Sequence, residues 1–431
     1  MSIGQKKDFE NLREEAKGKD KTDIQEWRGI IKDNFPELAF PAEIGLSVIG
    51  QLLIDDIKNP FALVYVDVPS SGKTIILNLF AACKNIAVTT DDFTPASFVS
   101  HAANRKKETL EKNDLLPKIK DKALIIRDLA PIFAKRDEDV QAMLGILIRV
   151  LDGEGLETTS GVHGKRGYRG DYLFMLLAAS THIRPRIWKA MGNLGSRLFF
   201  LNVGCKEKDE SSLVNQLAIP CRTKEIKVRN ATNSFIKTLW NKCSNKVEWN
   251  ISKDSDEIKK IVARFAKILA GLRSSINVWE DDFHDKKYNY AQPIKEMPDR
   301  LTQLLYNLVR GHALICNRTN INEEDLKVVA RVALDSAPPN RSKTFKALLK
   351  TDGILETNKV MEVLKCSRPT ALKEMQILEI LGIVKSEGDI EDNSERIGRP
   401  EASIRLKKKY QWFISNEAKQ LIIPHSVRNT L

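Results

Sequence analysis

A short turn between an apolar run and an apolar helical segment constrains the fold more than any other stretch of this chain. Residues 62–66 form a continuous apolar run of the kind that is buried on both faces of a parallel sheet. After the turn, residues 74–82 have the apolar spacing of a helix. A strand, a turn and a helix in this order predict the first unit of an α/β domain.

The turn reads Val-Pro-Ser-Ser-Gly-Lys-Thr over residues 68–74. Its backbone N–H groups and the N-terminus of the following helix favour an anion, because their donors are unsatisfied and the helix dipole is positive there. Lys73 is expected to reach the β- and γ-phosphates of ATP, and the Thr74 hydroxyl to ligate Mg²⁺. The predicted ATP-binding residues are Pro69, Ser70, Ser71, Gly72, Lys73 and Thr74.

Asp67 stands where this motif usually has its first glycine. A carboxylate near a triphosphate is unfavourable unless it is turned away. Because the donors nearest the phosphates come from residues 70–74, nucleotide binding is expected to survive the change.

Further strands are predicted at residues 123–126, 173–179 and 198–203, so residues 35–225 are expected to form a three-layer α/β domain. Asp128 follows the first of these strands and is the candidate acid near Mg²⁺. Either Asp128 is the metal-side acid and the base lies elsewhere, or Asp128 is the base and Arg127 replaces the metal-side acid. Ser180 and Thr181, at the end of the next strand, could orient the attacking water or the γ-phosphate.

The segments outside this domain differ from it in charge pattern and in apolar spacing. Residues 1–34 alternate in charge and predict an exposed arm, and residues 226–340 show helical spacing at 258–273, 299–316 and 323–333. Residues 335–341, with two adjacent prolines, are a candidate linker to a small third domain at 341–431. Arg197 precedes the last predicted strand and is either a surface charge or, in a ring, a residue that reaches a neighbour's γ-phosphate.

This order of motifs resembles that of AAA+ ATPases, in particular the minichromosome maintenance helicase branch. The stretch Met-Pro-Asp-Arg-Leu-Thr-Gln-Leu-Leu-Tyr at residues 297–306 resembles the lid helix of that branch. The resemblance implies an ATPase with ATP and Mg²⁺ as cofactors, a helical lid domain and a homo-oligomeric ring such as a hexamer. It also implies that Ser180 or Thr181 is sensor 1, Arg197 the arginine finger and Arg300 the sensor 2 residue.

Two segments predict contacts with DNA. Residues 152–170 indicate a β-hairpin, and in AAA+ helicases a hairpin at this point enters the central pore, so Lys165, Arg166 and Arg169 would follow phosphates there while Tyr168 stacks on a base. An ordinary solvated loop is the alternative.

Residues 343–413 resemble a winged helix-turn-helix domain, with helices at 357–366 and 367–378. Thr357 and Ser367 are the expected caps, and Ala371, Leu372, Met375 and Leu378 the inward face. The alternative is a winged helix that binds protein, since residues 387–395 are acidic. The expected DNA contacts are Arg368, Thr370 and Lys373 in a major groove, and Lys385, Arg396, Arg399, Lys407, Lys408 and Lys409 on phosphates.

Composition agrees with a globular protein that binds a polyanion. The net charge is +12, with 42% hydrophobic and 29% charged residues. The six cysteines are too scattered for a zinc site or a disulfide framework, and we expect a cytoplasmic protein without a membrane segment. The expected function is an ATP-driven motor on DNA, a helicase, translocase or replication protein of a mobile element. A DNA-binding regulator switched by ATP, with slow or absent hydrolysis, is the alternative that Arg127-Asp128-Leu129 favours.

Overall fold

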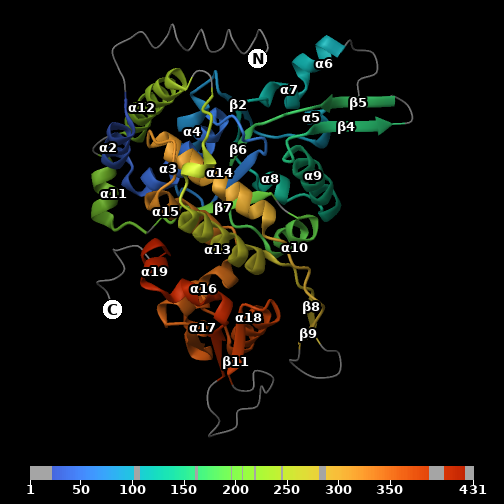
Figure 1. Ribbon diagram of the computed structural model, residues 1–431, viewed down its shortest axis with the longest axis vertical. Helices are drawn as coiled ribbons and strands as arrows, with labels where there is room; N and C mark the ends of the chain where they lie inside the picture. The colour runs from blue at the N-terminus through green and yellow to red at the C-terminus, as the bar shows by residue number, and fades with distance from the viewer. Residues whose placement is uncertain are drawn as a thin grey trace. The chain divides into compact units, whose positions relative to one another are not determined.

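The computed structural model describes residues 22–100, 107–160, 164–195, 197–205, 207–217, 220–243, 246–280, 288–387 and 402–422 (Figure 1). The chain divides into two compact units, and neither is continuous in sequence. Unit 1 comprises Met1–Ile183, Arg197–Ser255 and Asn307–Asp325, and unit 2 comprises Arg184–Ser196, Asp256–Tyr306 and Leu326–Leu431. The sequence predicted a different division, into an arm and three domains, and that division stays a prediction.

A five-stranded parallel sheet forms the centre of unit 1, in the order β2-β3-β6-β1-β7. The structure therefore confirms an α/β fold with a parallel sheet, and the four predicted strands correspond to β1, β3, β6 and β7. The short edge strand β2 was not predicted. The strands are β1 (Phe61–Val66), β2 (Ala87–Thr90), β3 (Ala123–Ile126), β6 (Met175–Ser180) and β7 (Leu198–Asn202).

Helices pack against this sheet in an arrangement compatible with the predicted three layers. Helix α4 (Lys73–Ala81) contacts β2, β3 and β6, whereas α3 (Ala39–Gly50) contacts β1 and β6. Helix α3 ends at Gly50, and beyond η2 Ile54 forms a bridge to Val247. Helix α12 (Cys221–Lys242) packs on α4 and on α2 (Ile24–Asn34).

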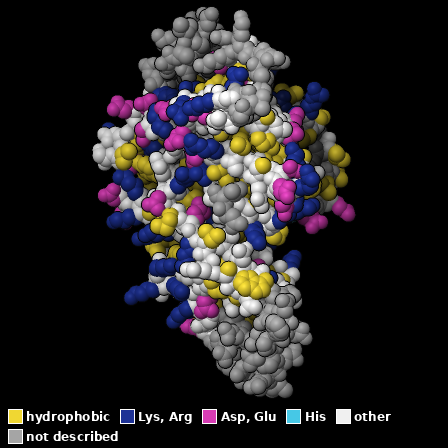
Figure 2. Space-filling model, turned by 90° about the vertical axis from the view of Figure 1, so that its right-hand side faces the viewer, with side chains coloured by type: hydrophobic (Ala, Val, Ile, Leu, Met, Phe, Trp, Pro, Cys, Tyr) yellow, Lys and Arg dark blue, Asp and Glu magenta, His cyan; other side chains and the backbone are white. Residues whose placement is uncertain are grey.

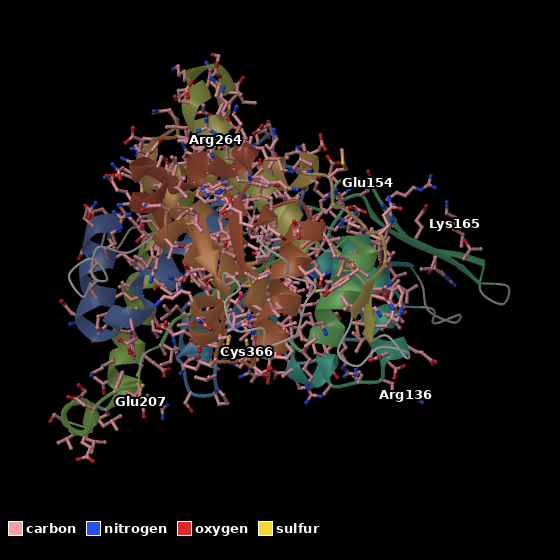
Figure 3. All side chains as sticks on the ribbon, turned by 90° about the horizontal axis from the view of Figure 1, so that it is seen from below. Arg136, Glu154, Lys165, Glu207, Arg264 and Cys366 are labelled. Atoms are coloured by element: carbon pink, nitrogen blue, oxygen red, sulfur yellow. The ribbon has the colours of Figure 1, made fainter. Side chains whose placement is uncertain are left out.

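The remaining elements of unit 1 are mostly short. A hairpin of β4 (Gly155–Ser160) and β5 (Gly164–Arg169) matches the one predicted at 152–170. The views of Figures 1 and 3 agree that it extends away from the rest of unit 1. The others are η1 (Pro36–Leu38), η2 (Gln51–Leu53), α5 (Pro95–Phe98), α6 (Lys107–Asn113), α7 (Leu115–Ile119), α8 (Ala130–Phe133), α9 (Asp137–Val150), α11 (Glu210–Leu217), η3 (Ile251–Lys253) and η4 (Glu323–Asp325).

Unit 2 is mainly helical. Helix α14 (Asp299–Ile315) begins in unit 2 and continues into unit 1 from Asn307. Among the described helices of both units, none combines the length and the apolar content needed to cross a membrane. The elements of unit 2 are α10 (Pro185–Leu194), α13 (Asp256–Arg273), β8 (Val278–Glu280), β9 (Tyr288–Tyr290), α15 (Leu326–Asp335), α16 (Pro339–Lys350), β10 (Ile354–Glu356), α17 (Thr357–Leu364), α18 (Arg368–Ile380), β11 (Val384–Glu387), β12 (Ser403–Leu406), η5 (Lys408–Ile414) and α19 (Asn416–Ile422).

The C-terminal region of unit 2 places two short helices beside a small antiparallel sheet. The sheet order is β10-β12-β11, and α17 and α18 are joined by Lys365, Cys366 and Ser367. The predicted inward residues of α18 are indeed buried: Ala371, Leu372, Met375 and Leu378.

One local prediction in this region is wrong. Thr357 is not a cap, because Glu356 occupies that position and the Thr357 hydroxyl donates to the Ala402 carbonyl at 2.7 Å. This contact joins residues that are 45 positions apart, so local spacing does not reveal it. Ser336 and Ala337, within the candidate linker at 335–341, are buried, and the linker stays a prediction.

A buried chain of alternating charges joins α2, α3 and the Asn307–Asp325 segment of unit 1. His312 lies at its centre, with Nδ1 2.5 Å from Asp325 Oδ1 and Nε2 3.0 Å from Glu43 Oε1. At the ends, Arg28 Nε donates to Glu43 at 3.1 Å and Arg318 donates to both Asp325 oxygens at 2.7 and 2.9 Å. Every charge in this network therefore has a partner of opposite sign, as burial requires.

The network fixes the ionisation of its members. Burial alone would raise the pKa of Glu43, but hydrogen bonds from His312 and Arg28 outweigh it and lower that pKa to about 2. Burial likewise opposes charge on His312, yet its hydrogen bonds with Asp325, Cys316 and Glu43 raise its pKa well above the ordinary value. The Cys316 thiol lies close by, but Arg28 donates to it at 3.4 Å as well as to Glu43, so a metal cation there would be repelled.

Replacing His312 by glutamine is expected to lower the free energy of unfolding by about 3–5 kcal/mol at mildly acidic pH, because both carboxylates lose a buried cation. The contribution of His312 is fully present below about pH 6.5 and is lost as the pH rises through the raised folded pKa. Urea unfolding of His312→Gln and wild type from mildly acidic to alkaline pH measures the difference in free energy of unfolding. His182→Gln, at an exposed histidine of unit 1, is the control, and a gap that does not narrow with rising pH would contradict the argument.

Candidate nucleotide site

The loop between β1 and α4 is folded around the amine of Lys73. Its Nζ donates to the carbonyls of Asp67 at 2.9 Å and Val68 at 2.6 Å, and to the Ser71 hydroxyl at 3.0 Å. Burial lowers the pKa of Lys73, while the charges of Asp67 and Asp128 act against that shift. The loop thus presents one partly desolvated cation, held by neutral oxygens that a phosphate could replace.

Backbone conformation at the start of α4 requires glycine. Gly72 has a φ of 85°, and a Cβ added there would lie 2.8 Å from two methyl carbons of Leu38. Ser70 also has a positive φ, 64°, which is uncommon outside glycine and is concentrated at functional sites. The loop is therefore a specific conformation, maintained by its surroundings.

The Asp67 carboxylate ties the loop to the backbone beyond β7 through hydrogen bonds. Its Oδ1 accepts the Val68 N–H at 2.7 Å, and its Oδ2 accepts the N–H groups of Gly204 at 2.9 Å and Cys205 at 3.2 Å, just beyond β7. The Cys205 thiol in turn donates to the Ser71 carbonyl at 2.9 Å. The Asp67 carboxylate is thus occupied by backbone donors, which agrees with the sequence-based condition that it be turned from an incoming phosphate.

The register of the sheet brings the ends of several strands to one edge. Val66 at the end of β1 lies opposite both Ser180 of β6 and Asn202 of β7. On the far side of β6, Ile126 of β3 pairs with Ala178, and the Leu129 N–H donates to the Ala179 carbonyl at 2.7 Å. Ligands of open parallel sheets bind beyond this carboxyl edge. The loop, Ser180 and the end of β3 therefore share the edge where a ligand would lie.

Arg127 and Asp128 have different partners. The Arg127 guanidinium forms an exposed two-pronged pair with Asp91, just after β2, with Nε 2.6 Å from Oδ1. Asp128 accepts the Ala130 N–H at 2.8 Å, and its charge acts on Lys73. Of the two, Asp128 is thus the residue whose charge acts on the lysine, and its role stays a prediction.

The donor set fits a nucleotide with Mg²⁺. The loop supplies N–H groups and Lys73, while Thr74 and Asp128 offer the oxygen ligands that Mg²⁺ prefers. Thr74, Pro69 and Ser70 are exposed, as is Thr181, whereas Ser71 and Ser180 are buried. These residues would hold phosphates and metal on the open side of the loop.

Arg197 is paired within its own chain. Its Nε donates to Asp152 Oδ1 at 2.8 Å, and the two side chains are 14% and 20% exposed. This ion pair gives Arg197 a role within its own subunit. Its assignment as an arginine finger stays a prediction.

Two arginines of α14 differ in their surroundings. Arg300 is exposed and belongs to the portion of the helix in unit 2, whereas the loop belongs to unit 1. Arg310 was given no role from the sequence, yet it is buried and donates to both Asp56 oxygens at 2.8 and 2.7 Å. Asp56 lies 254 residues earlier, so local sequence carried no signal for this contact.

The hairpin carries its expected basic residues, but with partners. Lys165 lies 3.1 Å from Glu157, and Arg169 pairs with the same carboxylate. Tyr168 was expected to stack on a base. In the structure its hydroxyl donates to Asp114 at 2.8 Å and its ring packs against Tyr172, and the stacking stays a prediction. Arg166 is half-buried, and Lys165 lies well out along the hairpin (Figure 3).

The predicted DNA contacts of unit 2 lie on three elements. Arg368 is exposed in the first turn of α18, where Thr370 lies 3.1 Å from the Ser367 hydroxyl, and Lys373 is half-buried one turn later. Lys385 is exposed on β11, and Lys407 and Lys408 follow β12, whereas Arg396 and Arg399 lie outside the described residues. On the face of the molecule that Figure 2 shows, Lys and Arg side chains are spread among Asp and Glu.

Replacing Asp67 by glycine, the usual residue at this position of the motif, is expected to destabilise the protein. The Cys205 N–H loses its acceptor and Gly204 loses one of two, which costs about 1–3 kcal/mol. Thermal unfolding of Asp67→Gly, Asp67→Asn and wild type measures the effect. Asn keeps one carbonyl oxygen and should lose less. Equal stability of Asp67→Gly and wild type would show that the hydrogen bonds of the Asp67 carboxylate contribute nothing to the free energy of unfolding.

Comparison with family models and with curated proteins gives no match for the chain. The case for a function therefore depends on the loop around Lys73, on Asp128 and on the shared sheet edge.

Proposed function

We propose that the protein is an ATP-dependent AAA+ motor acting on DNA, in replication, unwinding or translocation. The observation that carries the proposal is the loop between β1 and α4, in which Lys73 is held by two carbonyls and a hydroxyl at the N-terminus of a helix. An ATP phosphate would exchange with those oxygens. Lys73 and the loop N–H groups would then neutralise the phosphates, as phosphoryl transfer requires.

The metal and the attacking water would be placed by the neighbouring strand ends. Thr74 and Asp128 are the proposed Mg²⁺ ligands, and Ser180, between the loop and Asp128 at the same sheet edge, would orient the water or the γ-phosphate. Arg197 and Arg300 are proposed to act at the γ-phosphate in a ring of identical subunits. Arg197 would have to leave Asp152 to do so, which makes that ion pair a test of the ring.

Support for DNA as the partner comes from charge and from two structural features. The net charge of +12 favours a polyanion. The β4–β5 hairpin extends outward with Lys165, Arg166 and Arg169 on it, and α18 begins with the exposed Arg368 beside α17, as in a helix-turn-helix.

A second candidate function is an ATP-switched DNA-binding regulator that hydrolyses ATP slowly or not at all. The specific observation in its favour is at the end of β3. Arg127 is engaged by Asp91, and Leu129 is buried, so within residues 127–129 Asp128 is the single carboxylate. A binding site that lacks a second acid can hold a nucleotide without activating water efficiently.

Substituting Lys73 by alanine is expected to weaken ATP binding at least tenfold and to abolish turnover, because the loop loses its only side-chain cation in residues 67–74. Fluorescent-ATP titration and phosphate release, each with and without single- and double-stranded DNA, measure both. Lys84→Ala, at an exposed lysine just after α4, is the matched control. A wild-type protein that binds ATP but shows no DNA-stimulated hydrolysis would reject the motor and leave the regulator.

Arg197→Ala and Asp152→Ala both break the same ion pair but should differ in activity. If Arg197 acts in a neighbour's site, Arg197→Ala loses turnover by about 10³-fold or more while Asp152→Ala keeps most of it. Mixing Arg197→Ala with Lys73→Ala subunits should then restore some of the ATPase rate. Equal losses in the two single variants, with no recovery on mixing, would assign Arg197 a structural role alone.

A further inference from the structure

Unit 2 contains a pocket of about 520 Å³ that is separate from the loop around Lys73. Its walls come from α13, from the segment before α14, from Leu381 at the end of α18 and from η5, so four stretches distant in sequence form it. The volume falls within the range of about 300–1,000 Å³ that is usual for small-ligand pockets. The lining residues that matter below are Arg264, Lys267, Lys295, Glu296, Lys409 and Trp412.

The pocket has a strong excess of positive charge. Four cations line it, from Arg264 and Lys267 on α13 to Lys295 and Lys409, against the single carboxylate of Glu296. That carboxylate lies 3.6 Å from the buried Arg273, which compensates it. Within the described residues, none of the four lining cations forms an ion pair. Four cations around one pocket repel one another, and an anion would relieve that repulsion.

Burial also disfavours the charged form of one of these lysines, Lys409. It lowers the pKa of Lys409, and repulsion from Lys407 and Lys295 lowers it further. An anion in the pocket would reverse both effects, because it would favour the charged form of the lysine.

Aromatic rings form another portion of the wall. The Arg264 guanidinium lies over the Trp412 ring, 4.8 Å from its centroid. Trp412 is itself fixed, because its Nε1 donates to Glu417 at 3.0 Å and its ring packs edge-on against Phe265 and Phe413. An indole and a guanidinium held in this way offer flat surfaces on which a nucleic-acid base can stack.

We propose that this pocket binds a nucleotide unit, with its phosphate among Lys267, Lys295 and Lys409 and its base beside the Arg264–Trp412 pair. Inorganic phosphate alone would leave the aromatic wall unused, and an apolar ligand would leave the four cations unpaired. The nucleotide can be free or can belong to a single strand. This site stands independently of the ATP site proposed at Lys73, and failure of either proposal leaves the other intact.

The test uses the full chain carrying Lys73→Ala, so that the loop after β1 contributes little binding. Lys295→Glu with Lys409→Glu reverses two pocket charges. Lys327→Glu with Lys343→Glu makes the same change in net charge at exposed lysines of α15 and α16, away from the pocket. Fluorescence anisotropy with a short labelled oligothymidylate, and competition by AMP, measure affinity. Melting temperatures show that both double variants are folded.

We expect the pocket variant to bind oligothymidylate or AMP about tenfold more weakly or worse, and the control variant to lose less than about threefold. For the strand, the salt dependence should also fall by about 0.7 for each phosphate contact removed. Competition by AMP identifies a site for a free nucleotide, and a loss for the strand without AMP competition identifies a site for a strand. Trp412→Phe should weaken either ligand without altering the charge.

Two outcomes would overturn the proposal. Equal losses in the two double variants would show a general effect of net charge. Binding of a polyglutamate peptide that depends on Lys295 and Lys409, together with no binding of AMP or oligothymidylate, would assign the pocket to an acidic protein segment.

Discussion

The pairing of β1 with β6 on one side and β7 on the other determines where the loop, Ser180 and the partners of Asp67 lie in the candidate nucleotide site. Because Val66 is level with Ser180 and with Asn202, the next residue of each strand emerges at one edge of the sheet. The loop then begins at Asp67, which reaches the backbone just beyond β7. A slip of one residue in either pairing would exchange the two faces of the strand and remove these contacts together.

The same constraint explains how an acidic residue can occupy the start of a candidate phosphate-binding loop. Asp67 is 7% exposed and its carboxylate accepts three backbone N–H groups, so its charge is compensated by fixed dipoles. Lys73, in contrast, is a cation whose hydrogen-bond acceptors in the loop are neutral oxygens. The amine of Lys73 now donates to the carbonyls of the loop and could donate to phosphate oxygens in their place. That exchange of acceptors would need no large rearrangement of the loop.

The features that the sequence predicted well are those whose cause is local. The buried run of β1, the turn and α4 adjoin one another, and β3 is a continuous apolar stretch that ends at Arg127 and Asp128. Edge strand β2 has only four residues, none of them fully buried, and gave no such signal. The partners of Asp67, Arg197 and His312 could not be predicted either, because each contact joins segments whose proximity depends on the completed fold.

The two proposed functions, motor and regulator, place different chemical demands on Asp128. A carboxylate that coordinates Mg²⁺ is a poor proton acceptor, so the residue cannot serve as metal ligand and general base at once. Arg127 cannot supply the missing acid, and its exposed pair with Asp91 holds its guanidinium at the β2 side of the edge. A motor therefore needs either a base from another element, or a Mg²⁺ held by Thr74 and phosphate oxygens that leaves Asp128 free. A switch needs neither, because Lys73 and the loop are sufficient to hold the nucleotide.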